Sequence, residues 1–85
     1  MSGLGDAMGM DAGTVNRHLG RRLAEIREAR GWDRQRLGAL VGVPGAEILA
    51  YECGDGELSA RMLWRLAMRL GAPVERFYDG LSRAS

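Results

Sequence analysis

The sequence predicts an all-α domain of five short helices. Apolar residues recur in successive segments at the i, i+3, i+4 spacing of a helix, and glycine or proline separates those segments. No segment alternates apolar and polar residues in the way that a half-buried strand requires. With 46% hydrophobic residues in 85, the chain can form one small core, so a disordered chain is excluded.

The first helix is expected over residues 15–30. Leu19, Leu23 and Ile26 fall on one face of that segment, and Gly31 follows as a helix end.

The next two helices are expected over residues 34–41 and 45–53, joined by a tight turn. Asp33 is a good N-cap for the first of them, and Gly42 supplies the left-handed backbone that the turn needs. Gly38 lies midway along the first helix, where a crossing partner demands a very small residue. Apolar residues face inward on both sides of the turn at Leu37, Leu40, Val41, Val43, Ile48 and Tyr51. This combination within one short window indicates a helix-turn-helix unit.

The last two helices are expected over residues 60–70 and 74–79. The longer one follows the i, i+3, i+4, i+7 pattern at Leu63, Leu66, Ala67 and Leu70. Its Trp64 lies one step off this apolar stripe and is expected to be partly exposed. Its arginines form a second stripe at Arg61, Arg65 and Arg69, which fits either a solvated face or contact with an acidic partner.

The folded domain is expected over residues 15–81, with flexible tails at 1–14 and 82–85. No apolar run is long enough to span a membrane, and no signal peptide is recognised. The lone cysteine, Cys53, cannot form an internal disulfide, which favours a reducing, cytoplasmic location. No metal-ligand cluster, phosphate-binding loop or catalytic set is present. We therefore expect no cofactor, no metal and no enzymatic activity.

Charge is distributed unevenly, although the net charge is only +1. Residues 15–43 hold seven Arg and three acidic residues, and residues 61–85 hold five Arg and two acidic residues. Residues 44–60, between them, hold four acidic residues and no Arg. The chain therefore consists of two basic blocks around an acidic one.

The sequence resembles the phage-repressor and Cro-like (Xre-type) helix-turn-helix family, in a branch common in alphaproteobacteria. The resemblance covers about residues 15–80. The residues that carry it are Leu19-Gly20-Arg21-Arg22-Leu23, Arg27-Glu28-Ala29-Arg30-Gly31-Trp32, Leu37, Gly42-Val43, Ile48, Tyr51-Glu52, Gly54, Leu63, Leu66-Ala67, Leu70-Gly71 and Val74.

The resemblance implies a repressor-like five-helix domain that regulates transcription, usually as a dimer, and sets its third helix in the major groove of double-stranded DNA. The family's base-reading positions fall on Gly45, Ala46, Glu47 and Ala50. Its phosphate-contacting position falls on Arg34, and Arg36 and Arg17 are further candidates for phosphate contact. Relatives tie their first helix to the end of the third by an ion pair that falls here on Arg27 and Glu52. They pair through the C-terminal part of the domain, which points to a homodimer contact at Val74, Phe77 and Tyr78.

The reading positions depart from the family pattern. Gly45, Ala46 and Ala50 offer no side-chain hydrogen bond to a base, and Glu47 can only accept one. Two hypotheses follow. The chain is a DNA-binding regulator with an atypical acidic and apolar recognition helix, or it is a co-regulator or antagonist that binds another protein through that helix.

Overall fold

The computed structural model describes residues 12–80, and every regular element in that range is an α-helix. The helices are α2 (Ala12–Ala29), α3 (Arg34–Val41), α4 (Gly45–Cys53), α5 (Ala60–Leu70) and α6 (Val74–Tyr78). The predicted all-α fold of five helices is confirmed. The first helix begins three residues earlier than expected, so residues 12–14 are helical. The rest of the predicted tails lies outside the described residues.

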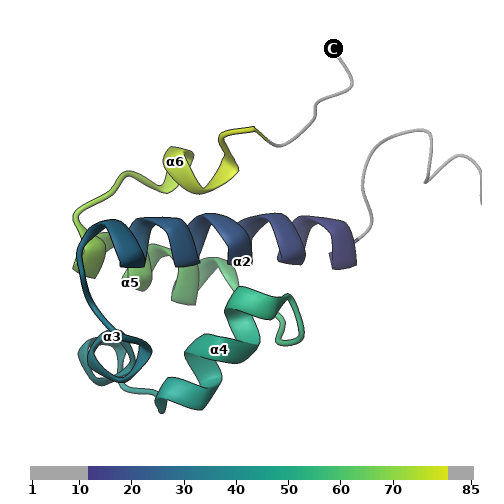
Figure 1. Cartoon of the computed structure of the whole chain (residues 1–85). Helices are drawn as coiled ribbons and strands as arrows, with labels where there is room; N and C mark the ends of the chain where they lie inside the picture. Colours follow the sequence, from purple (N-terminus) through teal and green to yellow (C-terminus); the bar gives the residue numbers. More distant parts are fainter. Residues whose placement is uncertain (1–11, 81–85) are drawn as a thin grey trace, which may run out of the picture.

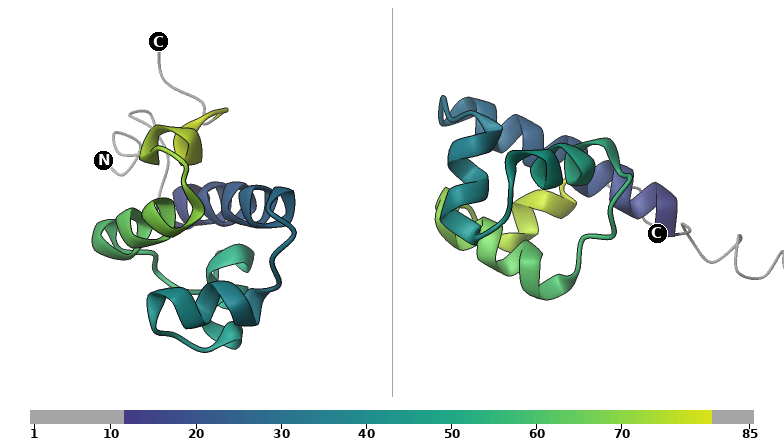
Figure 2. Two further views of the ribbon diagram at one scale, coloured as in Figure 1. Left: turned by 90° about the vertical axis from the view of Figure 1, so that its left-hand side faces the viewer. Right: turned by 90° about the horizontal axis from the view of Figure 1, so that it is seen from below.

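The long helix α2 lies between the other elements. Helices α3 and α4 cover one side of it, α6 covers the opposite side, and α5 packs against α3 and α6 (Figures 1 and 2). Helix α3 runs across the direction of α4, as the two helices of a helix-turn-helix do (Figure 1).

One core joins all five helices. The residues that the apolar pattern assigned to it are buried, apart from Val43, which is half-buried, and Leu40, which is 37% exposed. Two further residues belong to the core: Leu58, from the loop before α5, and Phe77, from α6. The core consists of Leu19, Leu23, Ile26, Leu37, Val41, Ile48, Tyr51, Leu58, Leu63, Leu66, Ala67, Leu70 and Phe77.

The turn between α3 and α4 forms as the sequence predicts. The Asp33 side chain accepts a hydrogen bond from the Arg36 backbone N–H at 2.7 Å, which caps α3. Gly42 ends the helix with a φ of 83°, in the left-handed region. A Cβ at Gly38 would lie 2.4 Å from the Val43 carbonyl oxygen, so only glycine permits the turn to fold this closely against α3.

Basic side chains of α2, together with that of Arg30 directly after it, bind the C-terminal ends of α5 and α6. Arg30 Nε donates to the Leu70 carbonyl at 2.9 Å, and Arg22 Nε donates to the Arg76 carbonyl at 3.1 Å. His18 Nε2 donates to the Asp79 carbonyl at 2.8 Å. Cationic groups at helix C-termini satisfy free carbonyls and interact favourably with the helix dipole. The sequence pattern places these side chains on the surface. In the structure they link the first part of the domain to the ends of α5 and α6.

A buried ion pair joins α2 to α4. Arg27 Nε lies 2.6 Å from Glu52 Oε2, and Arg27 Nη2 lies 3.3 Å from Glu52 Oε1. The two side chains are only 7% and 4% exposed. Arg27 Nη1 also donates to the Trp32 carbonyl at 2.7 Å, so the guanidinium holds the α2–α3 linker as well. This is the pair that the family resemblance implied.

Replacing Gly20 with alanine should destabilise the fold strongly. Its Cβ would lie 2.1 Å from the Tyr51 carbonyl oxygen, so α2 and α4 would have to separate. We expect a loss of about 2–3 kcal/mol in the free energy of unfolding, measured by urea denaturation. Gly42→Ala is the control. A Cβ at Gly42 would meet no neighbouring atom, so this variant carries only the strain of a positive φ. It should lower the free energy of unfolding by about 1 kcal/mol. Equal losses for the two variants would contradict the close helix contact.

Replacing Glu52 with glutamine should also destabilise the domain, because it leaves the Arg27 charge buried without its counter-charge. A loss of about 3–5 kcal/mol is expected in urea denaturation. The control is Arg34→Gln, which removes an exposed partner from the same carboxylate and should produce a much smaller loss. A Glu52→Gln variant as stable as the unmodified protein would show that the pair does not hold α2 against α4.

Candidate nucleic-acid interface

Helix α4 presents the four predicted base-reading positions along one stretch of its surface. Ala46 and Glu47 are exposed, and Gly45 and Ala50 are half-buried. Ile48 and Tyr51 point into the core, which fixes the rotation of the helix about its axis. Leu49 is 42% exposed beside these positions. The outward surface of α4 is therefore mostly apolar, with Glu47 as its hydrogen-bonding side chain at the N-terminal end.

Tyr51 holds the Glu47 carboxylate in place. Its hydroxyl donates to Glu47 Oε2 at 2.9 Å, and the tyrosine itself is 7% exposed. Burial raises the pKa of the Tyr51 phenol, and the hydrogen bond to Glu47 raises it further, so the hydroxyl remains a donor throughout the neutral range. The carboxylate is thus oriented from the core, while its remaining acceptor capacity faces outward.

The three predicted phosphate-binding arginines come from α2 and α3. Arg34 and Arg36 belong to the start of α3, whose backbone closely approaches Gly45 at the α4 N-terminus. Arg17, on α2, packs against Gly54 at the other end, where a Cβ would lie 2.5 Å from its Cγ. The Arg34 guanidinium reaches Glu52, so Arg34 and Arg17 both lie beside the C-terminal end of α4.

Each of these arginines also has a partner within the chain. Arg34 Nε donates to Glu52 Oε1 at 2.7 Å, and this hydrogen bond and the Glu52 charge raise the pKa of Arg34. The Arg36 guanidinium carbon lies 5.0 Å from the centroid of the Trp32 ring, a cation–π distance. Arg17 Nη2 lies 3.4 Å from Thr14 Oγ1. Helical spacing indicates the Arg17–Thr14 contact, which joins residues three apart on α2, whereas the partner of Arg34 is set by the tertiary fold.

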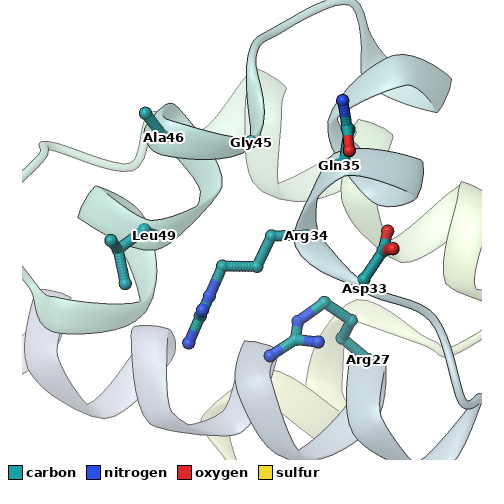
Figure 3. A pocket seen from close by; sticks show the side chains of 7 residues that line it. All are labelled: Arg27, Asp33, Arg34, Gln35, Gly45, Ala46 and Leu49. Carbon is teal, nitrogen blue, oxygen red and sulfur yellow. The ribbon is translucent and has the colours of Figure 1, made fainter.

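A hollow of about 540 Å³ opens between α3 and α4. Figure 3 shows the Arg34 side chain extending from α3 into this space, with Arg27 of α2 beside it and Leu49 and Ala46 on the α4 wall. Both guanidinium groups are paired with Glu52, and the Asp33 carboxylate also lines the hollow, whereas the α4 wall is apolar. The full lining is Arg27, Asp33, Arg34, Gln35, Gly45, Ala46 and Leu49.

The predicted dimer contact needs a correction. Phe77 has no exposed surface, because its ring fills the core between α6 and the rest of the domain, so it cannot contact a second chain. Val74 is half-buried against the core. Tyr78 is 43% exposed and remains available.

Residues 12–80 contain no group of three His, Cys, Asp or Glu side chains that could hold a metal ion. Cys53, at the end of α4, is exposed as a free thiol. None of the described helices combines the length and apolar character needed to cross a membrane.

Two curated bacterial proteins show sequence similarity to this chain. It is 33% identical over 69 residues to an uncharacterized transcriptional regulator in the ATPase CF(0) region of Rhodospirillum rubrum, covering 81% of this chain and 64% of that protein. It is 25% identical over 71 residues to an uncharacterized HTH-type transcriptional regulator of Rickettsia conorii, covering 84% and 57%. The chain thus spans about three fifths of the length of these relatives.

Solved structures share the fold. The restriction-modification controller protein C.AhdI from Aeromonas hydrophila matches with a TM-score of 0.68 and 26% identity, covering 72% of this chain and 92% of that one. The clp gene regulator ClgR from C. glutamicum matches with a TM-score of 0.72 and 25% identity, covering 74% and 82%. Hydroxypropylphosphonic acid epoxidase from S. wedmorenis also matches, with a TM-score of 0.69 and 28% identity, over 73% of this chain but only 33% of that enzyme.

A sequence model of one domain family matches most of the chain. The match runs over residues 18–77, from the middle of α2 to α6, and includes the whole α3–turn–α4 unit. It confirms the family that the sequence pattern predicted: this chain belongs to the helix-turn-helix domain family.

Proposed function

We propose that this chain is the DNA-binding part of a cytoplasmic transcription regulator that places α4 in the major groove of double-stranded DNA. The observation that carries the proposal is the placement of α4, whose reading positions are exposed or half-buried, with Arg34 and Arg17 beside its C-terminal end. The phosphates on either side of the groove would meet these arginines. The role is binding, without catalysis or a cofactor.

Base recognition in this proposal depends on Glu47. Its carboxylate accepts a hydrogen bond from the N4 amino group of cytosine, the pairing expected of an acidic side chain in the major groove. Tyr51 acts as a positioning residue, because its hydroxyl holds the same carboxylate at 2.9 Å. The alanine and glycine positions contribute shape and backbone contacts.

The regulator is proposed to act as a homodimer. Tyr78 and the exposed edge of Val74 supply the contact that we expect at the C-terminal part of the domain, with Phe77 excluded from it. A two-fold arrangement would place the two α4 helices about one DNA turn apart, ~34 Å. Light scattering at high micromolar concentration should give the mass of a dimer, and a monomer would contradict the pairing.

A second candidate function is protein binding through α4. It is favoured by the exposure of Leu49 beside Ala46, which forms an apolar strip bordered by the acidic Glu47. In this case the chain would be a co-regulator or antagonist of another DNA-binding protein. Failure of the chain to select any duplex over bulk DNA at low salt would favour this function over direct DNA recognition.

DNA binding should depend only weakly on salt. The proposal assigns at most three arginines in each subunit, Arg17, Arg34 and Arg36, to phosphates. The slope of log K against log salt should therefore be about −5 or shallower for a dimer, since each neutralised phosphate adds about −0.9. Arg34 makes the slope shallower still because it is paired with Glu52. A titration at several salt concentrations measures it, and a slope far steeper than −5 would require cations from elsewhere.

The acidic residue Glu57, in the loop after α4, should weaken binding to every sequence alike. Glu57→Gln should tighten binding about equally to specific and non-specific duplexes, because a loop charge meets phosphates and not bases. Glu75→Gln is the matched control, with the same charge change on an exposed residue of α6. The control should leave affinity nearly unchanged. Equal tightening by both variants would mean that only net charge matters.

Glu47 and Tyr51 should affect sequence preference in different ways. In a selection from random duplexes, Glu47→Gln should change the preferred base at one position, because glutamine both donates and accepts hydrogen bonds. Tyr51→Phe should keep the same preferred base but reduce the preference for it over the other bases several-fold. The variant retains the Glu47 carboxylate but loses the hydroxyl that orients it. Unchanged selections for both variants would contradict direct reading by Glu47.

A further inference from the structure

The outward side of α5 carries the two most exposed large apolar side chains of residues 12–80. Trp64 is 56% exposed and Met68 is 61% exposed. They are four residues apart, so they lie on neighbouring turns of one helix face. A hollow of about 280 Å³ lies among Trp64, Arg65, Met68 and Arg69. The core-facing side of the helix is complete without them, since Leu63, Leu66, Ala67 and Leu70 fill it.

Three arginines border this apolar pair, and their side chains lack partners. Arg61, Arg65 and Arg69 repeat every four residues along the exposed side of α5. Within residues 12–80, their guanidinium groups make no hydrogen bond, ion pair or aromatic contact, whereas Arg22 and Arg27 of α2, and Arg30 directly after it, all have partners. We call Arg61, Trp64, Arg65, Met68 and Arg69 the α5 face. It combines unpaired positive charge with uncovered apolar surface.

We propose that the α5 face is a docking surface for an acidic, amphipathic segment of a partner protein. An apolar side chain of that segment would cover Trp64 and Met68, and its carboxylates would pair with Arg65 and Arg69. Arginine forms bidentate hydrogen bonds with carboxylates, and tryptophan, methionine and arginine are enriched in the centres of protein interfaces.

The chemistry of the α5 face favours this occupant over two others. The DNA backbone offers phosphates to the arginines, but no apolar surface to cover Trp64 and Met68. A second copy of this face would bring two sets of three arginines together, and like charges across an interface are strongly unfavourable. An acidic and apolar protein segment satisfies both halves of the surface. The proposal does not depend on DNA binding by α4.

The test uses a synthetic helical peptide that carries leucine and glutamate on one face. Two reference peptides replace glutamate with glutamine, or leucine with serine. Binding is followed by the indole N–H resonance of Trp64, which is assigned with a Trp64→Phe variant because the chain has two tryptophans. The leucine and glutamate peptide should shift this resonance. Each reference peptide should bind about tenfold more weakly, because each lacks one half of the complementarity.

Two arginine variants separate a specific surface from general charge attraction. Arg65→Glu should weaken binding about tenfold. Arg21→Glu makes the same charge change at an exposed arginine of α2 and should change binding less than twofold. Equal weakening by the two variants would overturn the proposal, as would the absence of a Trp64 shift at millimolar peptide.

Two further measurements would reveal a different occupant. A random-sequence duplex that shifts Trp64 more than the peptide does, at the same salt concentration, would assign the α5 face to nucleic acid and overturn the proposal. A Trp64→Ala variant that turns a dimer into a monomer in light scattering would assign the face to a second copy and also overturn it. An unchanged mass for this variant, together with the peptide response, would support the protein partner.

Discussion

The Glu52 carboxylate is the group on which the position of α4 depends. It accepts hydrogen bonds from Arg27 of α2 and from Arg34 of α3, although it belongs to α4. Arg27 in turn holds the Trp32 carbonyl in the α2–α3 linker. Because Glu52 is only 4% exposed, these contacts are little weakened by water. One buried carboxylate thus fixes α4 relative to both helices that flank it, and with it the direction in which the reading positions face.

The same use of arginine inside the fold explains why so little positive charge remains for a ligand. Arg22 and Arg30 bind the C-terminal carbonyls of α6 and α5, and Arg34 shares Glu52 with Arg27. Arg36 lies against the Trp32 ring. A count of basic residues in the sequence overestimates the charge available to DNA, since most cations of the first basic block already satisfy the domain itself. The unpaired arginines of α5 stand out against this background.

The sequence predicts the helices well because local rules determine them. Capping by Asp33, the left-handed Gly42 and the apolar spacing of α5 each act within a few residues, and the structure has all three. Phe77 was misjudged because an aromatic residue in a five-residue helix has no period to indicate which side is buried. Leu58 was missed because it lies in a loop, without a helical repeat.

The candidate site was less predictable than the fold, for a physical reason. Family resemblance gives the positions that face DNA, but the partner of Arg34 is a residue far away in the sequence. The Arg34–Glu52 contact spans 18 residues, and no local pattern indicates it. The hydrogen bond from Tyr51 to Glu47 is different: it joins residues four apart on one helix, so helical spacing alone could have indicated it.

The charge pattern of α4, which at first opposes DNA binding, matches the geometry of a major groove. A helix of nine residues is about 13 Å long, close to the roughly 12 Å width of the groove. Phosphates line the two sides of the groove, and Arg34 and Arg17 lie beside the C-terminal end of α4. The groove floor carries the base edges, where cytosine presents an amino donor that a carboxylate can accept from. With α4 placed across the groove, Glu47 would lie over donors while the arginines lie near phosphates. Acidic charge in the middle of the interface would then select sequence at the expense of affinity.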